Sequence, residues 1–370
     1  MKSFLITLSV LPVFFLIIIS KFRSFLSKTV HRLPPGPPGL PIIGNLHQLD
    51  ASNLPDHLWR LSKRYGPLMS LRLGLVQTLV VSSAEMAKEV LKTRDLVFCT
   101  RPLLTGPKKL SYNNKDVASS PYNEYWREMR KICTLHLFSL KQVNSFGLVR
   151  EDEVFAMIDT IKTGISTKQE VNLNEIVIIL MTNIICRVAF SKRPYGYSDE
   201  QPEARRFHEL VLECSALLAN FYYRDYFPMM GWLDKLNGSI TRLEKNFKDM
   251  DECYQEIIDE HLNQNRPKEN REDMVDILLQ LKQDSDSSIE FSFDHIKGIL
   301  MNILLGGAET RMSMGAVLVE VALSNLLYSF DWEVPEGTKE INTLPTAGAV
   351  SHKKDALRLV AKIYDHGCNN

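Results

Sequence analysis

The sequence predicts a mainly α-helical protein with a small β-sheet near its N-terminus and one N-terminal transmembrane helix. Residues 4–20 are apolar and carry no charge, residues 69–81 alternate as strands do, and apolar residues elsewhere recur at helical spacing. The chain has 370 residues, enough to bury a large core.

The stretch Phe4–Ser20 spans roughly 25 Å as a helix, the short end of what a bilayer requires. A cleaved secretory signal is the alternative, but no small-x-small cleavage site follows it. Basic residues come next, and they favour a cytosolic position for the downstream side: Lys21, Arg23, Lys28 and Arg32. We therefore expect residues 1–21 to be a retained anchor.

Residues 22–45 form a basic and proline-rich linker that includes the run Leu33–Pro41. Proline fixes φ and favours an extended, stiff chain, so this segment is interpreted as a spacer between the anchor and the body. A ligand for a proline-binding module is the alternative reading of the same composition.

The body begins with a helix over 54–65, strands over 69–73 and 76–81, and a capping box Ser82-x-x-Glu85 that opens a further helix. Apolar periodicity predicts the remaining helices. They cover residues 123–135, 140–162, 173–189, 202–219, 239–263 and 274–283.

Composition excludes several classes of function. Net charge is zero and no stretch interleaves basic and aromatic residues, so no nucleic-acid partner is expected. The six cysteines are widely separated, with no C-x-x-C pair, and the histidines lack H-E-x-x-H spacing. The sequence therefore predicts neither a disulfide framework nor a metal site built from these patterns.

The stretch Ile296–Tyr328 is apolar, and its first ten residues are apolar on nearly every face, as in a buried helix. Gly306 and Gly307 leave room for a bulky ligand against the backbone. Glu309 and Thr310 follow, and an acid beside an alcohol at such a gap can relay protons. A kinked core helix with a polar turn at its end is the alternative.

Trp126 and Arg130 are four residues apart and share a face of the helix predicted over 123–135. An indole N–H and a guanidinium together can hold the carboxylates of a flat cofactor. A cation–π pair at the surface is the alternative.

Taken in order, these features resemble the microsomal cytochrome P-450 family of haem-thiolate monooxygenases, most closely its plant secondary-metabolism members. The resemblance rests on the anchor, Pro34–Gly39, Phe98-x-x-Arg101-Pro102, Trp126-x-x-x-Arg130 and Gly306-Gly307-x-Glu309-Thr310. It implies a haem cofactor and a site in which Trp126 and Arg130 face the haem propionates. It also implies that Glu309 and Thr310 handle protons. The implied partners are the endoplasmic reticulum membrane, an NADPH-dependent reductase and a small lipophilic substrate.

The resemblance is interrupted after Thr310. The family continues with an E-x-x-R helix and an F-x-x-G-x-R-x-C-x-G loop whose cysteine binds the iron, and neither follows here. Residues 311–317 instead resemble the stretch after that loop, and residues 319–332 resemble the last helix of the family. We therefore interpret residues 46–310 as the N-terminal part of the domain, joined to a C-terminal fragment, residues 311–370. Glu203-x-x-Arg206 spells E-x-x-R but lies far upstream, and we attribute it to chance.

Two classes of function follow. The first is a monooxygenase of small lipophilic metabolites, with the chain as written inactive because the cysteine ligand is missing. The second is a non-catalytic, membrane-anchored remnant or a mis-joined gene product. Cys368 lies in a polar tail without a preceding glycine-rich loop, so the sequence predicts that it is not the ligand.

Overall fold

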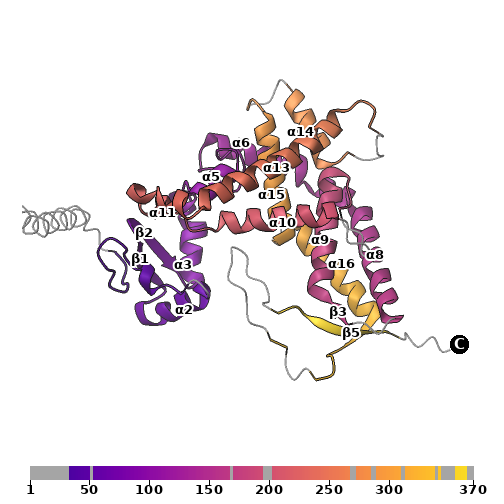
Figure 1. The fold of residues 1–370 in the computed structure, drawn as a ribbon, viewed down its shortest axis with the longest axis horizontal. Coiled ribbons are helices and arrows are strands. Elements are labelled where there is room, and N and C mark those ends of the chain that lie inside the picture. The colour runs from indigo at the N-terminus through magenta and orange to yellow at the C-terminus, as the bar shows by residue number, and fades with distance from the viewer. Residues whose placement is uncertain are drawn as a thin grey trace, which may run out of the picture. The chain divides into compact units, whose positions relative to one another are not determined.

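The computed structural model describes residues 33–50, 53–166, 170–194, 202–266, 272–284, 289–309, 313–337, 341–342 and 355–364 (Figure 1). The predicted anchor, Thr310 and Cys368 lie outside these residues. The chain divides into two compact units, with the main boundary between Thr93 and Arg94. Each unit is described separately below.

The first unit contains the predicted N-terminal sheet. Strands β1 (Leu68–Leu73) and β2 (Val76–Val81) pair antiparallel and follow α2 (Leu54–Tyr65), which ends before Gly66, a glycine with φ of +102°. The predicted helix over 54–65 and both predicted strands are confirmed. The alternating apolar residues of β1 supply the buried side, with Met69 fully buried and Leu71 nearly so.

The helix after β2 starts one residue later than predicted. Helix α3 (Ala84–Lys88) is capped by Ser83, whose side chain accepts a hydrogen bond from the Met86 N–H at 3.2 Å, and a π-helical turn, η2 (Glu89–Thr93), follows it. The predicted cap at Ser82 is wrong because the backbone N–H of Ser82 donates to the Pro67 carbonyl at 2.8 Å. Ser82 is thus held beside the hairpin.

The proline-rich segment packs against the first strand. The Ser70 N–H donates to the Pro35 carbonyl at 2.9 Å, and Asn45 bridges the Pro37 carbonyl and the Arg72 N–H at 3.0 and 2.8 Å. A Cβ on Gly36 would lie 1.9 Å from the Ser70 carbonyl oxygen. Residues 33–45, which the sequence analysis assigned to the linker, therefore belong to the folded unit, because this loop supplies hydrogen-bond partners to the free edge of β1.

The second unit is mainly helical, and its strands form a small antiparallel sheet in the order β3–β5–β4. A mainly α-helical fold with small antiparallel sheets is thus confirmed. The strands are β3 (Val171–Asn172), β4 (Phe330–Glu333) and β5 (Arg358–Ile363). The helices are α4 (Asp95–Phe98), α5 (Thr105–Leu110), α6 (Glu124–Ile132), α7 (Leu140–Ser145), α8 (Gly147–Ser166), α9 (Leu173–Phe190), α10 (Pro202–Leu218), α11 (Tyr223–Tyr226), α12 (Leu233–Leu236), α13 (Ser239–Leu262), α14 (Met274–Gln283), α15 (Phe293–Glu309) and α16 (Ser313–Ser329).

The helix predicted over 140–162 is broken in two. Phe146 ends α7 and is almost fully buried, and α8 begins at Gly147. The Arg150 guanidinium donates to the Val143 carbonyl at 2.7 Å and satisfies an acceptor at the end of α7. Burial of one aromatic side chain thus overrides a helical pattern that local spacing alone makes continuous.

Helices α9 and α15 form the centre of the core (Figure 1). Leu180, Ile184 and Leu300 are at most 1% exposed. Among the described residues, α9 is the one helix long and apolar enough to cross a membrane, and half of it is buried within the protein. Its apolar character is that of a core helix packed against α8, α14 and α15.

A buried histidine lies in the first turn of α15. His295 Nδ1 accepts hydrogen bonds from the Ser292 backbone N–H at 3.0 Å and from its hydroxyl at 2.7 Å, and its ring stacks on Phe291. Burial, and then the charge of Lys115, hold the pKa of His295 below its ordinary value. The ring is therefore kept neutral, with Nδ1 as the acceptor.

We expect Gly36→Ala to destabilise the first unit by about 1–3 kcal/mol, because the new methyl group collides with backbone that is held by β1. The control is Gly164→Ala in α8, where no atom lies within 4 Å of the new Cβ. Denaturant unfolding of both variants measures the difference. Equal stability of the two variants contradicts the packing of this loop on β1.

We also expect the second unit to lose stability as the pH falls from about 7.5 to about 5.5. The folded-state pKa of His295 is lowered, so the unfolded chain binds more protons and acid favours unfolding. The stabilising contribution is complete above the ordinary value of 6.5 and is lost below it. His295→Gln keeps an acceptor without titrating, so its unfolding free energy changes less over this range. An identical pH dependence in wild type and variant rules out this role.

Candidate functional site

Helix α6 positions the first two predicted site residues. Asn123 caps the helix by accepting a hydrogen bond from the Trp126 backbone N–H at 2.8 Å, which orients its first turn. Trp126 is 7% exposed, and its ring meets Tyr122 at a centroid distance of 5.4 Å. Arg130, one turn later, is exposed, and its guanidinium carbon lies 5.2 Å from the centre of the indole.

The indole N–H of Trp126 already has an acceptor. It donates to the Val117 carbonyl at 2.8 Å. In this arrangement the indole fixes the loop before α6, and the guanidinium of Arg130 remains the group that can meet an anion. The cation–π contact proposed as the alternative is present, and it leaves the N–H groups of the guanidinium available for hydrogen bonds.

Arg101 is a neighbour of this pair that the sequence analysis did not select. Its guanidinium carbon lies 4.8 Å from the centre of the Trp126 ring, and it donates to the Cys99 carbonyl at 2.7 Å. Within the described part of the chain, neither Arg101 nor Arg130 forms an ion pair. The Phe98-x-x-Arg101-Pro102 pattern marked Arg101, but nothing in the sequence placed it beside a tryptophan 25 residues away.

Asn302 of α15 forms hydrogen bonds with residues 116–118, in the loop before α6. Its side-chain oxygen accepts hydrogen bonds from the Val117 and Ala118 N–H groups, both at 3.1 Å, and its amide donates to Asp116 at 2.8 Å. The Asp116 carboxylate is fully buried and also accepts from the Ser119 N–H. Burial raises the pKa of Asp116, although the hydrogen bonds from Asn302 and Ser119 oppose that effect.

Asn302 and the predicted Gly306 lie on the same side of α15. Asp294, Gly298, Asn302 and Gly306 are spaced four residues apart and lie along neighbouring positions of the helix surface. The helix is continuous from Phe293 through Glu309, including Gly306 and Gly307. Thr310 lies outside the described residues, as does the Glu309 side chain, so the structure places the backbone of Gly306–Glu309 and neither polar side chain of the motif.

The described cysteines are mostly buried thiols. Cys133 directly follows α6, and burial raises the pKa of its thiol to about 12. Burial also raises the pKa of Cys186 in the core, where Cys214 is 1% exposed. Raised pKa values favour the thiol over the thiolate, which is the metal-binding form.

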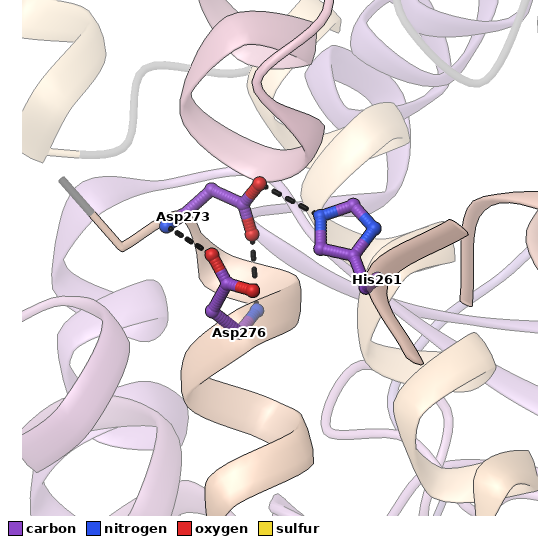
Figure 2. Close-up of side chains that lie close together, drawn as sticks. All are labelled: His261, Asp273 and Asp276. Atoms are coloured by element: carbon purple, nitrogen blue, oxygen red, sulfur yellow. Dashed lines mark hydrogen bonds and ion pairs between the residues drawn. The ribbon is translucent and has the colours of Figure 1, made fainter. Parts of the chain in front are cut away.

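His261, Asp273 and Asp276 form a second polar cluster, between α13 and α14 (Figure 2). His261 Nε2 lies 2.8 Å from Asp273, and Arg266 forms ion pairs with both aspartates at 3.0 and 3.2 Å. Asp273 and Asp276 complete a capping box at the start of α14. Burial raises the pKa of Asp273, but the hydrogen bonds from His261 and the Asp276 N–H outweigh it, so the pKa lies below its ordinary value.

The second nitrogen of His261 is also occupied. Its Nδ1 lies 2.6 Å from the Ile257 carbonyl oxygen, so both ring nitrogens face acceptors. Arg266 pairs with both carboxylates, and Asp273 also accepts from the Ser191 hydroxyl, so both carboxylates already have partners within the protein. The hydrogen bonds and ion pairs of the cluster link the end of α13 to the start of α14.

Comparison with known proteins identifies the scaffold. The cytochrome P-450 family model matches residues 34–318. The 6,7,8-trihydroxycoumarin synthase of Pastinaca sativa is 47% identical over 294 residues, which cover 79% of this chain and 57% of that enzyme. The strychnine-11-hydroxylase of Strychnos nux-vomica is 44% identical over 303 residues, covering 82% of this chain and 58% of that enzyme.

A third relative extends the match slightly. The 2-methylbutanal oxime monooxygenase of Manihot esculenta is 40% identical over 325 residues, covering 86% of this chain and 62% of that enzyme. The chain thus spans less than two thirds of the length of these curated relatives. The extent of the family match, together with the helical fold, shows that the chain belongs to the cytochrome P-450 family.

Proposed function

We propose that the chain carries the substrate-side scaffold of a monooxygenase for small lipophilic plant metabolites and that, as written, it does not form a haem-thiolate centre. The family implies haem iron as cofactor and a reductase as electron donor. The observation that carries the proposal is an imbalance: the guanidiniums of Arg101 and Arg130, which form no ion pair within the described chain, lie beside the Trp126 indole, while burial raises the pKa of the Cys133 and Cys186 thiols.

The propionate side of haem fits the residues present. Arg101 and Arg130 flank one indole without an ion-pair partner in the described chain, and guanidinium groups bind carboxylates through charge-assisted hydrogen bonds. These two residues would hold the propionates. Trp126 would act indirectly, by fixing Val117 and by offering its ring to both guanidiniums.

The iron side does not fit. A thiolate ligand pushes electron density onto the iron, and this favours O–O cleavage. Cys133 and Cys186 are buried neutral thiols, and Cys99 lies beside the Leu96 carbonyl in a short helical turn, with no glycine-rich loop around it. We therefore derive no catalytic step from this chain alone.

In a completed chain, the family resemblance implies proton-handling roles for Glu309, whose backbone ends α15, and for Thr310. Bound haem supplies the centre at which oxygen is activated. Thr310 would hold a proton-bearing group near that oxygen, and Glu309 would exchange protons with solvent. Gly306, next along the side of α15 that carries Asn302, has no side chain and would leave room for the flat cofactor.

A non-catalytic remnant anchored in the endoplasmic reticulum membrane is the second candidate. One observation favours it: Val319, Leu323 and Leu327, four residues apart on α16, are 45%, 51% and 61% exposed. A row of exposed apolar side chains on a core helix favours association or degradation. Such a protein would still reach the reductase through its anchor without turning over substrate.

We expect the membrane-expressed chain, reduced and exposed to carbon monoxide, to show no red-shifted Soret band, because that band requires a thiolate on the iron. A full-length relative expressed in parallel provides the positive control. A band at the thiolate position refutes the proposed inactivity. Cys368→Ser is then the first variant to measure, because Cys368 is the one cysteine of the sequence that lies outside the described residues.

The propionate contacts are tested in a completed chain, in which the segment missing after Thr310 is supplied from a relative. Charge-assisted hydrogen bonds contribute about 1.5–3 kcal/mol each, so we expect Arg101→Leu with Arg130→Leu to lower haem retention at least about tenfold. Arg127→Leu on the same helix is the control, because Arg127 pairs with Glu124 at 3.6 Å. Haem content per protein measures the effect. Full retention in the double variant excludes these two residues as the propionate ligands.

A further inference from the structure

The sheet of the first unit ends at β2. It has two strands, and the proline-rich segment supplies hydrogen-bond partners to the outer edge of β1. Among the described residues, no group forms a hydrogen bond with the outer edge of β2. A two-stranded hairpin is marginally stable in water, and an unpaired edge is a template for a further strand. β2 is therefore the place at which this sheet can be extended.

The hydrogen bonds of β1 show which residues of β2 face outward. Ser70 and Arg72 donate their backbone N–H groups to the proline-rich segment, away from β2. In an antiparallel pair, directly opposite residues point their backbone groups either both toward the shared ladder or both away from it. The residues opposite Ser70 and Arg72 are Leu79 and Gln77. Their backbone groups, and by alternation those of Val81, therefore form the free edge of β2.

This edge lacks the features that normally keep edge strands apart. Charged residues, proline and bulges are the usual protection against further pairing. Residues 73–84 contain neither a charged residue nor a proline, and β2 pairs with β1 over its whole length without a bulge. Leu75, Val76 and Leu79 are 44%, 40% and 44% exposed. Two identical edges can therefore meet without like charges facing each other.

The outward residues of β2 are arranged symmetrically about Leu79. When two copies of β2 pair antiparallel around a two-fold axis at this residue, Leu79 of one copy lies opposite Leu79 of the other. Gln77 of each copy then lies opposite Val81 of the other, and every outward N–H meets an outward carbonyl. A self-complementary surface of this kind is what a two-fold homodimer requires. The pattern therefore favours a second copy of this chain as the occupant of the edge.

We propose that two copies of the chain associate through β2, antiparallel and centred on Leu79, so that their two-stranded sheets join into one sheet of four strands. Main-chain hydrogen bonds provide the affinity of such strand addition, and the side chains that meet across the new ladder provide its specificity. The pairing needs neither haem nor turnover. It therefore goes beyond the function proposed above and is tested separately from it.

Cysteine crosslinking of the full chain in its expression membranes tests the register. Opposite residues at hydrogen-bonded positions have Cα atoms about 5.5 Å apart, which suits a disulfide. We therefore expect Leu79→Cys to give a covalent homodimer under a mild oxidant. Val81→Cys on the same edge is the matched control, because its own copy lies four residues further along the ladder, about 14 Å away, and cannot be bridged. The wild-type chain, with its six cysteines, gives the background.

A change of charge at the axis tests the same edge without crosslinking. Leu79→Lys places two ammonium groups directly opposite each other, so we expect the dissociation constant of the dimer to rise at least about tenfold. Leu79→Val keeps a neutral strand-forming side chain, and its dissociation constant is expected to stay within about threefold of wild type. Because Leu79 is 44% exposed, neither variant disturbs the buried side of the sheet. Sedimentation of the purified chains in detergent measures the dimer fraction.

Four results overturn the proposal. A wild-type chain that sediments as a monomer at every concentration excludes the dimer. A dimer that Leu79→Lys leaves intact is held by another surface, such as the exposed apolar row of α16. Equal crosslinking of Leu79→Cys and Val81→Cys excludes the register. A Leu79→Cys adduct whose mass differs from twice that of the chain shows that another protein occupies the edge.

Discussion

The side chain of Asn302 makes the contact on which the candidate site depends. One amide on a buried helix accepts two backbone N–H groups of residues 117 and 118 and donates to a buried aspartate. The peptide that it fixes presents the Val117 carbonyl to the Trp126 indole. Through this chain of hydrogen bonds, the register of α15 determines where α6 presents Arg130. A polar network of this kind specifies one arrangement because every buried member must be satisfied.

The apolar helix α15 tolerates its described polar side chains because each has a hydrogen-bond or ion-pair partner. Lys297 is 6% exposed, and its ammonium group lies 2.6 Å from Asp251 of α13. His295 accepts from Ser292 in its neutral form. Buried ion pairs add little net stability but exclude alternative packings in which one charge is left alone. The polar side chains of α15 thus fix its rotation, and its apolar ones provide the burial.

The balance of charge and cysteine chemistry supports the proposal that this member of the family does not form a haem-thiolate centre. Guanidiniums that suit carboxylates occupy the loop before α5 and α6 itself, which belong to the matched region. The metal-binding form of cysteine requires an environment that lowers its pKa, and Cys133 and Cys186 lie where burial raises it.

Local pattern in the sequence was sufficient for the elements whose signals are short-range. The helix over 54–65, the hairpin after it and the helix over 274–283 follow from periodicity, glycine and caps, and the structure confirms them. The same pattern failed at Ser82 and at Phe146, where a hydrogen bond to Pro67 and the burial of one ring decided the outcome. The approach of Arg101 to Trp126, the Asn302 network and the capping of α5 by Asp225 were decided by tertiary structure alone. These contacts join residues 25 to 186 positions apart, and no periodicity within a single element encodes which distant side chain completes a hydrogen bond.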